Sequence, residues 1–282
     1  MRLIILGSGS PEAYARRASS GYLVEVGGDK ILFDCGGGVF DNLLRVGLRP
    51  ADITHIVFSH LHSDHMMDYA RLIHAAWDEG GRRIKVYGPA PIAEITTGFF
   101  GPDGVLSHDL RARTELGPSQ QVWLDRGGTL PRAWPAPEIA EFVPGDMIAG
   151  NGWQIRSCSV PHAQPYLTCI AFALSSGGKK FVYSGDSGSS QELETLADRA
   201  DLLLHWCYRL DSQPAEGEMA ALTPTPSQIG ALAQRCSAQR LILTHFRPSM
   251  DSEQQHAEAL DQVAKVYNGP VTIAEDQDSV EF

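Results

Sequence analysis

The segment His60-Leu61-His62-Ser63-Asp64-His65 places three histidines and one aspartate within six positions. The whole chain of 282 residues has only ten histidines, so a chance cluster of this density is improbable. Imidazole nitrogen and carboxylate oxygen are the donors that zinc prefers. The apolar, β-branched run 53–59 predicts a strand before the segment, and the spacing over 67–77 predicts a helix after it. The segment is therefore expected on a strand-to-helix loop, where α/β folds carry their functional side chains.

The spacing within this segment favours two ions over one. On a chain leaving a strand, the alternate residues His60 and His62 can point to the same side and share an ion. Asp64 and His65 stand where the chain turns into the helix, so they can address a second ion nearby. The spacing differs from the i, i+4 histidines of a helical zinc site.

Further donors are predicted at the ends of later strands. His162 follows Cys158-Ser159-Val160-Pro161, Asp186 follows Phe181-Val182-Tyr183-Ser184-Gly185, and His245 follows Leu241-Ile242-Leu243-Thr244. A lone histidine at a strand end is more often a hydrogen-bonded core residue. Three ligand-type residues in the same context indicate a shared site.

The order of elements predicts an α/β fold in four layers, an αββα sandwich. Short strands are expected first, at 2–6, 21–26 and 30–34, with helices and strands interleaved after residue 39. Strands at 154–160, 168–175, 179–184, 201–205 and 240–244 and helices at 189–198, 226–236 and 251–267 complete the prediction. We expect a single domain over 1–282. Residues 98 to about 150, rich in Pro and Gly with little periodicity, are expected to form an insertion that flanks the active site and has no core of its own.

Composition limits the partners and the compartment. The net charge of −11 and pI near 5.3 make a nucleic-acid partner unlikely unless basic residues are locally concentrated. Five scattered cysteines without a C-x-x-C pair predict reduced thiols and not a disulfide framework. No signal peptide and no run of about 20 apolar residues is visible, so a cytoplasmic protein without a membrane span is expected.

The H-x-H-x-D-H segment followed in order by His162, Asp186 and His245 resembles the metallo-β-lactamase superfamily. The similarity is greatest to its ribonuclease Z and arylsulfatase-like branch, through Leu6-Gly7-Ser8-Gly9-Ser10-Pro11, Phe33-Asp34-Cys35-Gly36, Tyr183-Ser184-Gly185-Asp186 and Leu243-Thr244-His245-Phe246.

The resemblance implies two zinc ions, with Mn²⁺ or Fe²⁺ as alternatives, and a homodimer. It implies a first metal held by His60, His62 and His162, a second held by Asp64, His65 and His245, and Asp186 bridging both. Two such ions trap a water and lower its pKa, so that a bridging hydroxide is available at neutral pH.

Two departures from the ribonuclease Z pattern bear on the substrate. The His-Glu-Ala-Thr-like segment of that family is His205-Trp206-Cys207-Tyr208 here, which keeps the histidine and loses the glutamate. A histidine expected before the penultimate helix is missing from residues 220–226. Both missing residues belong to the acid–base machinery for cutting RNA.

The sequence therefore predicts a dinuclear zinc hydrolase of a small-molecule ester: a phosphodiester, an aryl sulfate, or a lactone or other carboxylic ester. A ribonuclease Z-like tRNA 3′ endonuclease and a β-lactamase are the alternatives, and a flavo-di-iron oxidoreductase or a metal sensor comes from outside the hydrolases. Asp64 is the expected proton acceptor, and His205 the expected acid, with Tyr208 and Tyr166 as further candidates. Trp206 and Tyr208 are candidate walls for an apolar leaving group, Arg209 and Arg247 are candidate anion partners, and Cys207 is expected to be a passive thiol.

Overall fold

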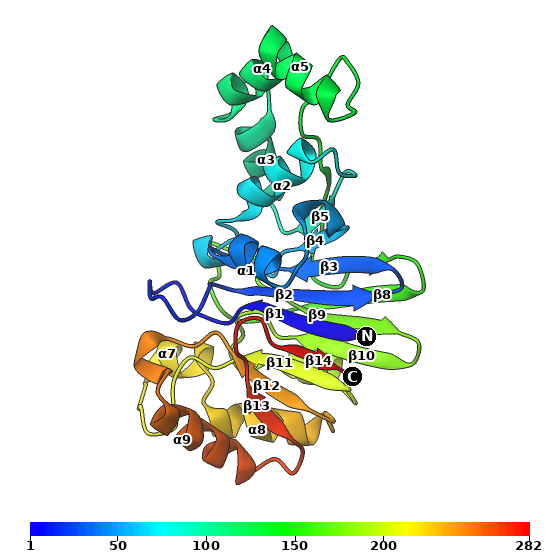
Figure 1. The fold of residues 1–282 in the computed structure, drawn as a ribbon. Helices are drawn as coiled ribbons and strands as arrows, with labels where there is room; N and C mark the ends of the chain where they lie inside the picture. The colour runs from blue at the N-terminus through cyan, green and yellow to red at the C-terminus, as the bar shows by residue number, and fades with distance from the viewer.

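The computed structural model describes residues 1–282 and consists of two seven-stranded sheets packed face to face (Figure 1). The first sheet has the spatial order β14-β1-β2-β3-β4-β5-β6 and the second the order β13-β12-β11-β10-β9-β8-β7. The strands of the first sheet are β1 (Arg2–Gly7), β2 (Gly21–Val26), β3 (Asp29–Phe33), β4 (His55–Val57), β5 (Lys85–Gly88), β6 (Glu138–Glu141) and β14 (Ser279–Glu281). Those of the second are β7 (Met147–Ala149), β8 (Trp153–Ser159), β9 (Ile170–Ser176), β10 (Lys179–Tyr183), β11 (Leu202–Trp206), β12 (Leu241–Thr244) and β13 (Val271–Ile273).

Helices cover both outer faces of the sandwich. They are α1 (Val39–Arg45), α2 (Tyr69–Asp78), α3 (Ile92–Phe100), α4 (Ser107–Glu115), α5 (Gly117–Asp125), α6 (Gln191–Leu196), α7 (Gly217–Leu222), α8 (Pro226–Arg235) and α9 (Glu253–Ala264). Three hydrophobic clusters fill the spaces between the layers. One packs helices α1, α2 and α3 against the first sheet, and one lies between the two sheets. The third packs α6, α8 and α9 against the second sheet. The predicted four-layer αββα sandwich is therefore confirmed.

Aromatic side chains hold the two sheets together. The ring of Phe33 on β3 lies 5.8 Å from that of Phe172 on β9 and 5.7 Å from that of Phe181 on β10. All three side chains are fully buried. Ring pairs at such separations add a specific geometry to the area that they bury, so they fix the register of one sheet on the other.

Strand direction explains where the predicted ligands meet. In the first sheet β3, β4 and β5 are parallel to one another. In the second sheet β10, β11 and β12 are parallel, and β8 runs in the same direction because β9 is antiparallel to both β8 and β10. The carboxyl ends of β4, β8, β10 and β12, which precede the predicted ligands, therefore lie at the same end of the sandwich.

The segment 98–150 is more regular than the sequence predicts. It includes α4 and α5, which project away from the sandwich, and β6 and β7, which form an edge of each sheet (Figure 1). We call residues 101–137 the arm. Its helices escape a periodicity analysis because α5 buries none of its residues and α4 buries only Ser107, Leu110 and Thr114.

The elements expected elsewhere are present with shifted ends, as in α2 and α9, and the short helix α7 was not expected. None of the helices is both long enough and apolar enough to cross a membrane.

Candidate metal centre

The seven predicted ligands come together at the end of the sandwich where β4, β8, β10 and β12 finish. His60 and Asp186 lie three residues beyond β4 and β10, His162 lies three residues beyond β8, and His245 directly follows β12. His245 has a φ of 65°, a left-handed conformation that is uncommon for a residue with a side chain. Strain of this kind persists where the surrounding structure fixes it, and it is frequent at functional sites.

The first group of donors contains only histidines. His60 Nε2 lies 2.9 Å from His62 Nδ1, and His162 Nε2 lies 3.3 Å from the same atom. The donor atoms of His60, His62 and His162 all lie within 4.8 Å of one another. This is the set that the family resemblance implies for the first metal.

The second group combines Asp64, His65 and His245, whose donor atoms also lie within 4.8 Å of one another. His245 Nε2 is 3.2 Å from Asp64 Oδ2, and His65 Nε2 is 3.5 Å from that oxygen. Asp186 lies between the two groups. Its carboxylate oxygens are 3.6 Å from His162 Nε2, 3.6 Å from His65 Nε2 and 3.3 Å from His245 Nε2.

Buried polar atoms without partners show that this cluster fits a cation. His65 Nε2 and Asp186 Oδ1 are buried and make no hydrogen bond. Burial without a partner costs such groups free energy, which a metal ion at the centre would recover. The donor set of imidazoles and carboxylates is the type that zinc takes.

The protonation states of His60 and Asp186 favour the binding of a cation. Burial lowers the pKa of His60 well below its ordinary value, so its imidazole is neutral and keeps a lone pair for a metal. Burial also opposes ionisation of Asp186, but the surrounding histidines, His245 first, hold the pKa of that carboxyl well below its usual range. Asp186 is therefore a carboxylate with an unpartnered oxygen.

Asp34, which sequence reasoning did not assign to the site, supports both groups from behind. Its buried carboxylate accepts hydrogen bonds from His65 Nδ1 at 2.8 Å, Ser59 Oγ at 2.8 Å, the Ser59 backbone N–H at 2.7 Å and the Tyr183 hydroxyl at 2.7 Å. Since the Ser59 hydroxyl donates to Asp34, it accepts from His60 Nδ1 at 3.0 Å. Asp34 thus directs the Nε2 atoms of both histidines toward the cluster, an arrangement typical of metal-ligating histidines.

A cavity of about 400 Å³ opens over the cluster. His62, Asp64, His162, Asp186 and His245 line one side of it. The other side is formed by Pro11, Trp206, Tyr208, Glu218, Met219, Leu222 and Thr223, mostly from the connection between β11 and α8. No residue of 98–150 lines this cavity, so the insertion does not contribute to its walls.

The sequence matches a known protein family. The family model described as the Beta-lactamase superfamily domain matches residues 29–246, which is most of the chain. The chain belongs to the metallo-β-lactamase superfamily. It is a hydrolase, and its fold implies divalent metal ions at the His/Asp cluster.

The similarity to individual relatives covers almost the whole chain. Ribonuclease Z of Mycobacterium bovis (strain BCG / Pasteur 1173P2) is 26% identical over 294 residues, covering 100% of this chain and 98% of the relative. The metallo-β-lactamase fold protein YhfI from Bacillus subtilis superposes with a TM-score of 0.76 at 22% identity, covering 99% of this chain and 98% of the other. The short form of human tRNase Z superposes with a TM-score of 0.70 at 20% identity, covering 100% and 99%.

The structure places the predicted acid, His205, away from the metal cavity. Along β11 the side chains alternate, and His205 points to the helix side with Leu203 while Trp206 reaches the cavity. His205 Nδ1 is hydrogen bonded to the Trp206 carbonyl at 2.8 Å, and burial lowers the pKa of His205 to about 4. The geometry does not support His205 as the acid of this superfamily member.

The other candidate side chains differ in whether they reach the metal cavity. Tyr208 lines the cavity, whereas Tyr166 is 90% exposed and does not. Trp206 packs edge-on against His162, with ring centroids 5.2 Å apart, and so forms a wall as expected. Cys207 is buried, and burial raises the pKa of its thiol to about 12, which fits a passive role.

Both candidate arginines make contacts within the protein. Arg209 Nε donates to the Thr223 carbonyl at 2.9 Å, and its Nη1 donates to the Gln213 carbonyl at 3.0 Å. Arg247 donates to Glu12 at 2.6 Å and stacks 4.7 Å from the centroid of the Tyr208 ring. Both therefore hold protein groups in place.

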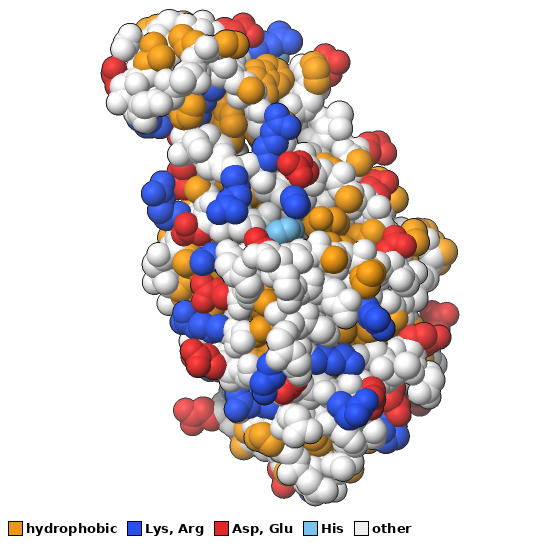
Figure 2. All heavy atoms as spheres, turned by 90° about the vertical axis from the view of Figure 1, so that its right-hand side faces the viewer, with side chains coloured by type: hydrophobic (Ala, Val, Ile, Leu, Met, Phe, Trp, Pro, Cys, Tyr) orange, Lys and Arg blue, Asp and Glu red, His pale blue; other side chains and the backbone are white.

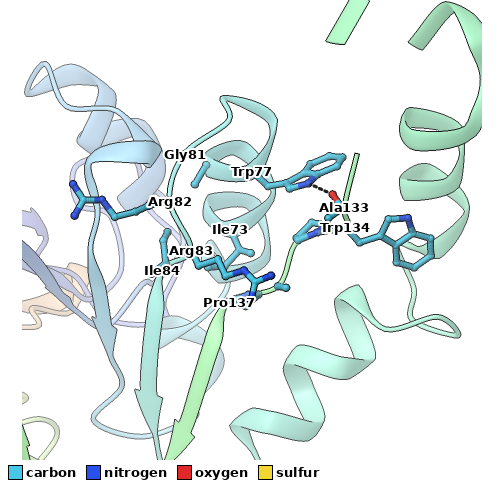
Figure 3. A pocket seen from close by; sticks show the side chains of 12 residues that line it. Ile73, Trp77, Gly81, Arg82, Arg83, Ile84, Ala133, Trp134 and Pro137 are labelled. Carbon is cyan, nitrogen blue, oxygen red and sulfur yellow. Dashed lines mark hydrogen bonds between the residues drawn. The ribbon is translucent and has the colours of Figure 1, made fainter. Parts of the chain in front are cut away.

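A second cavity, of about 180 Å³, lies at the base of the arm (Figure 3). It is lined by residues 73–84 and 133–137, among them Trp77, Arg83 and Trp134. Trp77 Nε1 donates to the Ala133 carbonyl at 2.7 Å, the bond drawn in Figure 3. No predicted ligand lines this cavity, so it is separate from the metal centre.

Proposed function

We propose that this protein is a dinuclear-metal phosphodiesterase acting on a small substrate in the cavity beside Trp206 and Tyr208. The observation that carries the proposal is the convergence of His60, His62 and His162, and of Asp64, His65 and His245, on Asp186 at the floor of that cavity. Full-length relatives named ribonuclease Z support a phosphodiester as the bond that is cleaved, because RNA is joined by phosphodiesters.

Two zinc ions held by these groups, with Asp186 shared, would supply an activated water and neutralise the charge that develops on the phosphoryl oxygens. In the net reaction the water oxygen bonds to phosphorus, and the bond from phosphorus to the leaving oxygen breaks with its electron pair. Asp64 would accept the proton of the water. Tyr208 is the one tyrosine in the cavity wall, and its hydroxyl can donate a proton to the leaving oxygen.

The cavity supports a small substrate. Its lining has no lysine or arginine, and the two nearby arginines are engaged by protein groups. An RNA-binding groove requires cations for the phosphate backbone, and the net charge of −11 opposes such binding.

The second candidate is cleavage of precursor tRNA 3′ ends. The ribonuclease Z relatives cover almost the whole of both chains, and on substrate they favour this alternative over a small ester. The loss of the glutamate and histidine described above weighs against it. A β-lactamase activity stays a further alternative to test, and the homodimer and the cytoplasmic location stay predictions.

A substrate panel joined to metal analysis tests the proposal. We expect purified protein to hold two divalent ions and to hydrolyse bis(p-nitrophenyl) phosphate faster than p-nitrophenyl sulfate, p-nitrophenyl acetate, a lactone or nitrocefin. Activity should disappear on chelation and return with zinc. Cleavage of precursor tRNA with a steep loss at rising salt would favour the second candidate instead.

Variants of the cluster test the residue assignment. Asp186→Ala and His60→Ala should lose metal and reduce turnover at least a hundredfold, because each removes a ligand. His108→Ala, which changes an exposed histidine of the arm, is the matched control and should keep both. Wild-type metal content and turnover in Asp186→Ala would reject the assignment.

A further inference from the structure

Two of the candidate ligand histidines, His162 and His245, are held differently from the others. His60 and His65 are each tied through Nδ1 to the hydrogen bonds around Asp34. The Nδ1 atom of His245 is buried and makes no hydrogen bond, and the Nδ1 atom of His162 makes none either. Metal-ligating histidines almost always have a hydrogen-bond partner at the nitrogen that does not bind the ion. The orientation of these two rings therefore has to come from packing.

One aromatic ring outside the ligand set packs against both imidazoles. Trp206, at the end of β11, is 2% exposed. Its ring centroid lies 5.2 Å from that of His162 and 5.6 Å from that of His245, with interplanar angles of 82° and 83°. Aromatic rings prefer such edge-to-face contacts, which restrict how one ring can turn against the other. The remaining ring contacts of the two imidazoles are with other ligand histidines.

The indole N–H of Trp206 reaches the segment that carries Asp186. Trp206 Nε1 donates to the carbonyl of Ser187 at 2.6 Å, and Ser187 is fully buried and directly follows Asp186. The backbone of Trp206 is itself fixed, because it pairs in the sheet with Thr244 of β12, the residue before His245. Trp206 thus contacts, directly or through one carbonyl, every candidate ligand that the second sheet supplies.

We propose that Trp206 is a positioning residue of the metal centre, which holds His162, Asp186 and His245 as Asp34 holds the histidines of the first sheet. It stands where the ribonuclease Z pattern has a glutamate, so a buried, uncharged side chain replaces an acid–base group. The inference rests on the metal ligands of the proposed function and not on the substrate. Since its three partners are drawn from both groups of donors, loss of Trp206 should weaken the binding of both ions.

The test compares Trp206→Leu and Trp206→Phe with the same changes at Trp153. Trp153 is a matched control because it is also a buried indole whose N–H is hydrogen bonded, to Asp29 at 2.8 Å, and whose ring packs edge-on against a histidine, His55, at 5.1 Å. It lies at the start of β8, whereas the ligands gather where β8 finishes. Loss of a buried tryptophan is thereby separated from loss of contact with the ligands.

Competition with a chromophoric chelator measures the affinity for zinc. We expect Trp206→Leu to weaken the binding of both ions by about tenfold, and Trp206→Phe, which keeps a ring but loses the N–H, to weaken it by about threefold. The absorption spectrum of the protein loaded with cobalt(II) depends on ligand geometry and should change in both variants. The Trp153 variants should keep the wild-type affinity and spectrum, although their melting temperatures fall to a similar extent.

Wild-type affinity for both ions in folded Trp206→Leu would overturn the proposal, as would an equal loss of affinity in Trp153→Leu. If Trp206→Leu does not fold, Trp206→Phe decides, and an unchanged cobalt spectrum and zinc affinity in that variant would reject the role of Trp206. Binding is measured without turnover. A wild-type protein that binds two ions but does not hydrolyse the diester would therefore reject the proposed function alone.

Discussion

At the scale of single residues, Asp34 shows how one carboxylate organises a site that it does not enter. It is fully buried and has a φ of 58°, so its backbone turns sharply where β3 ends. Its hydrogen bonds reach His65 directly and His60 through Ser59, one histidine from each group of donors. The two groups therefore share one support, and we expect them to respond together when it is altered.

Replacing Asp34 by Asn tests this shared support. An amide has one accepting oxygen and a donating NH₂ group, so it must lose either the backbone N–H of Ser59 or the donors Ser59 Oγ, His65 and Tyr183. We expect a 10- to 100-fold loss of affinity for both metals, the usual effect of removing a partner of a ligating histidine. Competition with a chromophoric zinc chelator measures it, and Asp103→Asn, an exposed aspartate of the arm, is the control. An unchanged affinity for either metal would show that the groups are oriented independently.

The structure brings the candidate ligands together but places the candidate proton donor His205 elsewhere, for a physical reason. The seven ligand candidates stand out because ligand-type residues directly follow apolar strands, and the structure brings all seven together. The role of His205 depended on which face of β11 it occupies, and a strand buried on both faces gives no alternation from which to read this.

At the scale of elements, the arm contrasts with the sandwich that carries it. Five of its apolar side chains, Val105, Leu116, Val122, Leu124 and Leu130, are each more than 40% exposed. Hydrophobic side chains gather on the end of the arm in the face shown in Figure 2. The sequence predicted an insertion without a core of its own. We propose that the arm is held instead by a polar and aromatic clasp around Arg132.

The clasp makes a prediction about local order. The Arg132 guanidinium lies 3.8 Å from the Trp77 ring centroid and 4.2 Å from that of Trp123, and it pairs with Asp78 at 2.9 Å. Arg132→Ala should cost the arm about 2 kcal/mol, the sum of two partly desolvated cation–π contacts. Hydrogen exchange should then accelerate in residues 116–129 but not in β10 or β11, and turnover should be unchanged because the arm does not line the metal cavity.

Arg126→Ala is the control for the clasp, since Arg126 is exposed and pairs with Asp78 without stacking on a ring. It should change the exchange of the arm little, as expected for a surface ion pair. Loss of protection across the whole sandwich in Arg132→Ala would show that the arm and the sheets unfold as one unit.

At the scale of the whole molecule, the metal centre joins the two halves of the chain. The segment His60 to His65 follows a strand of the first sheet, whereas His162, Asp186 and His245 follow strands of the second. Each predicted group of donors takes members from both. Ions bound there would therefore link the sheets, and unfolding would separate the ligands. An ion that binds only the folded state stabilises it by mass action.

Removal of the ions should consequently lower the melting temperature of the entire protein. At a free metal concentration about a thousandfold above Kd, one site contributes about 4 kcal/mol. For a chain of this size that corresponds to about 7 °C. We expect scanning calorimetry to show a fall of at least this amount on chelation and its reversal by added zinc. Asp186→Ala should melt near the chelated wild type and respond little to the chelator. A wild-type melting temperature that is indifferent to chelation would mean that the cluster does not link the two sheets through metal.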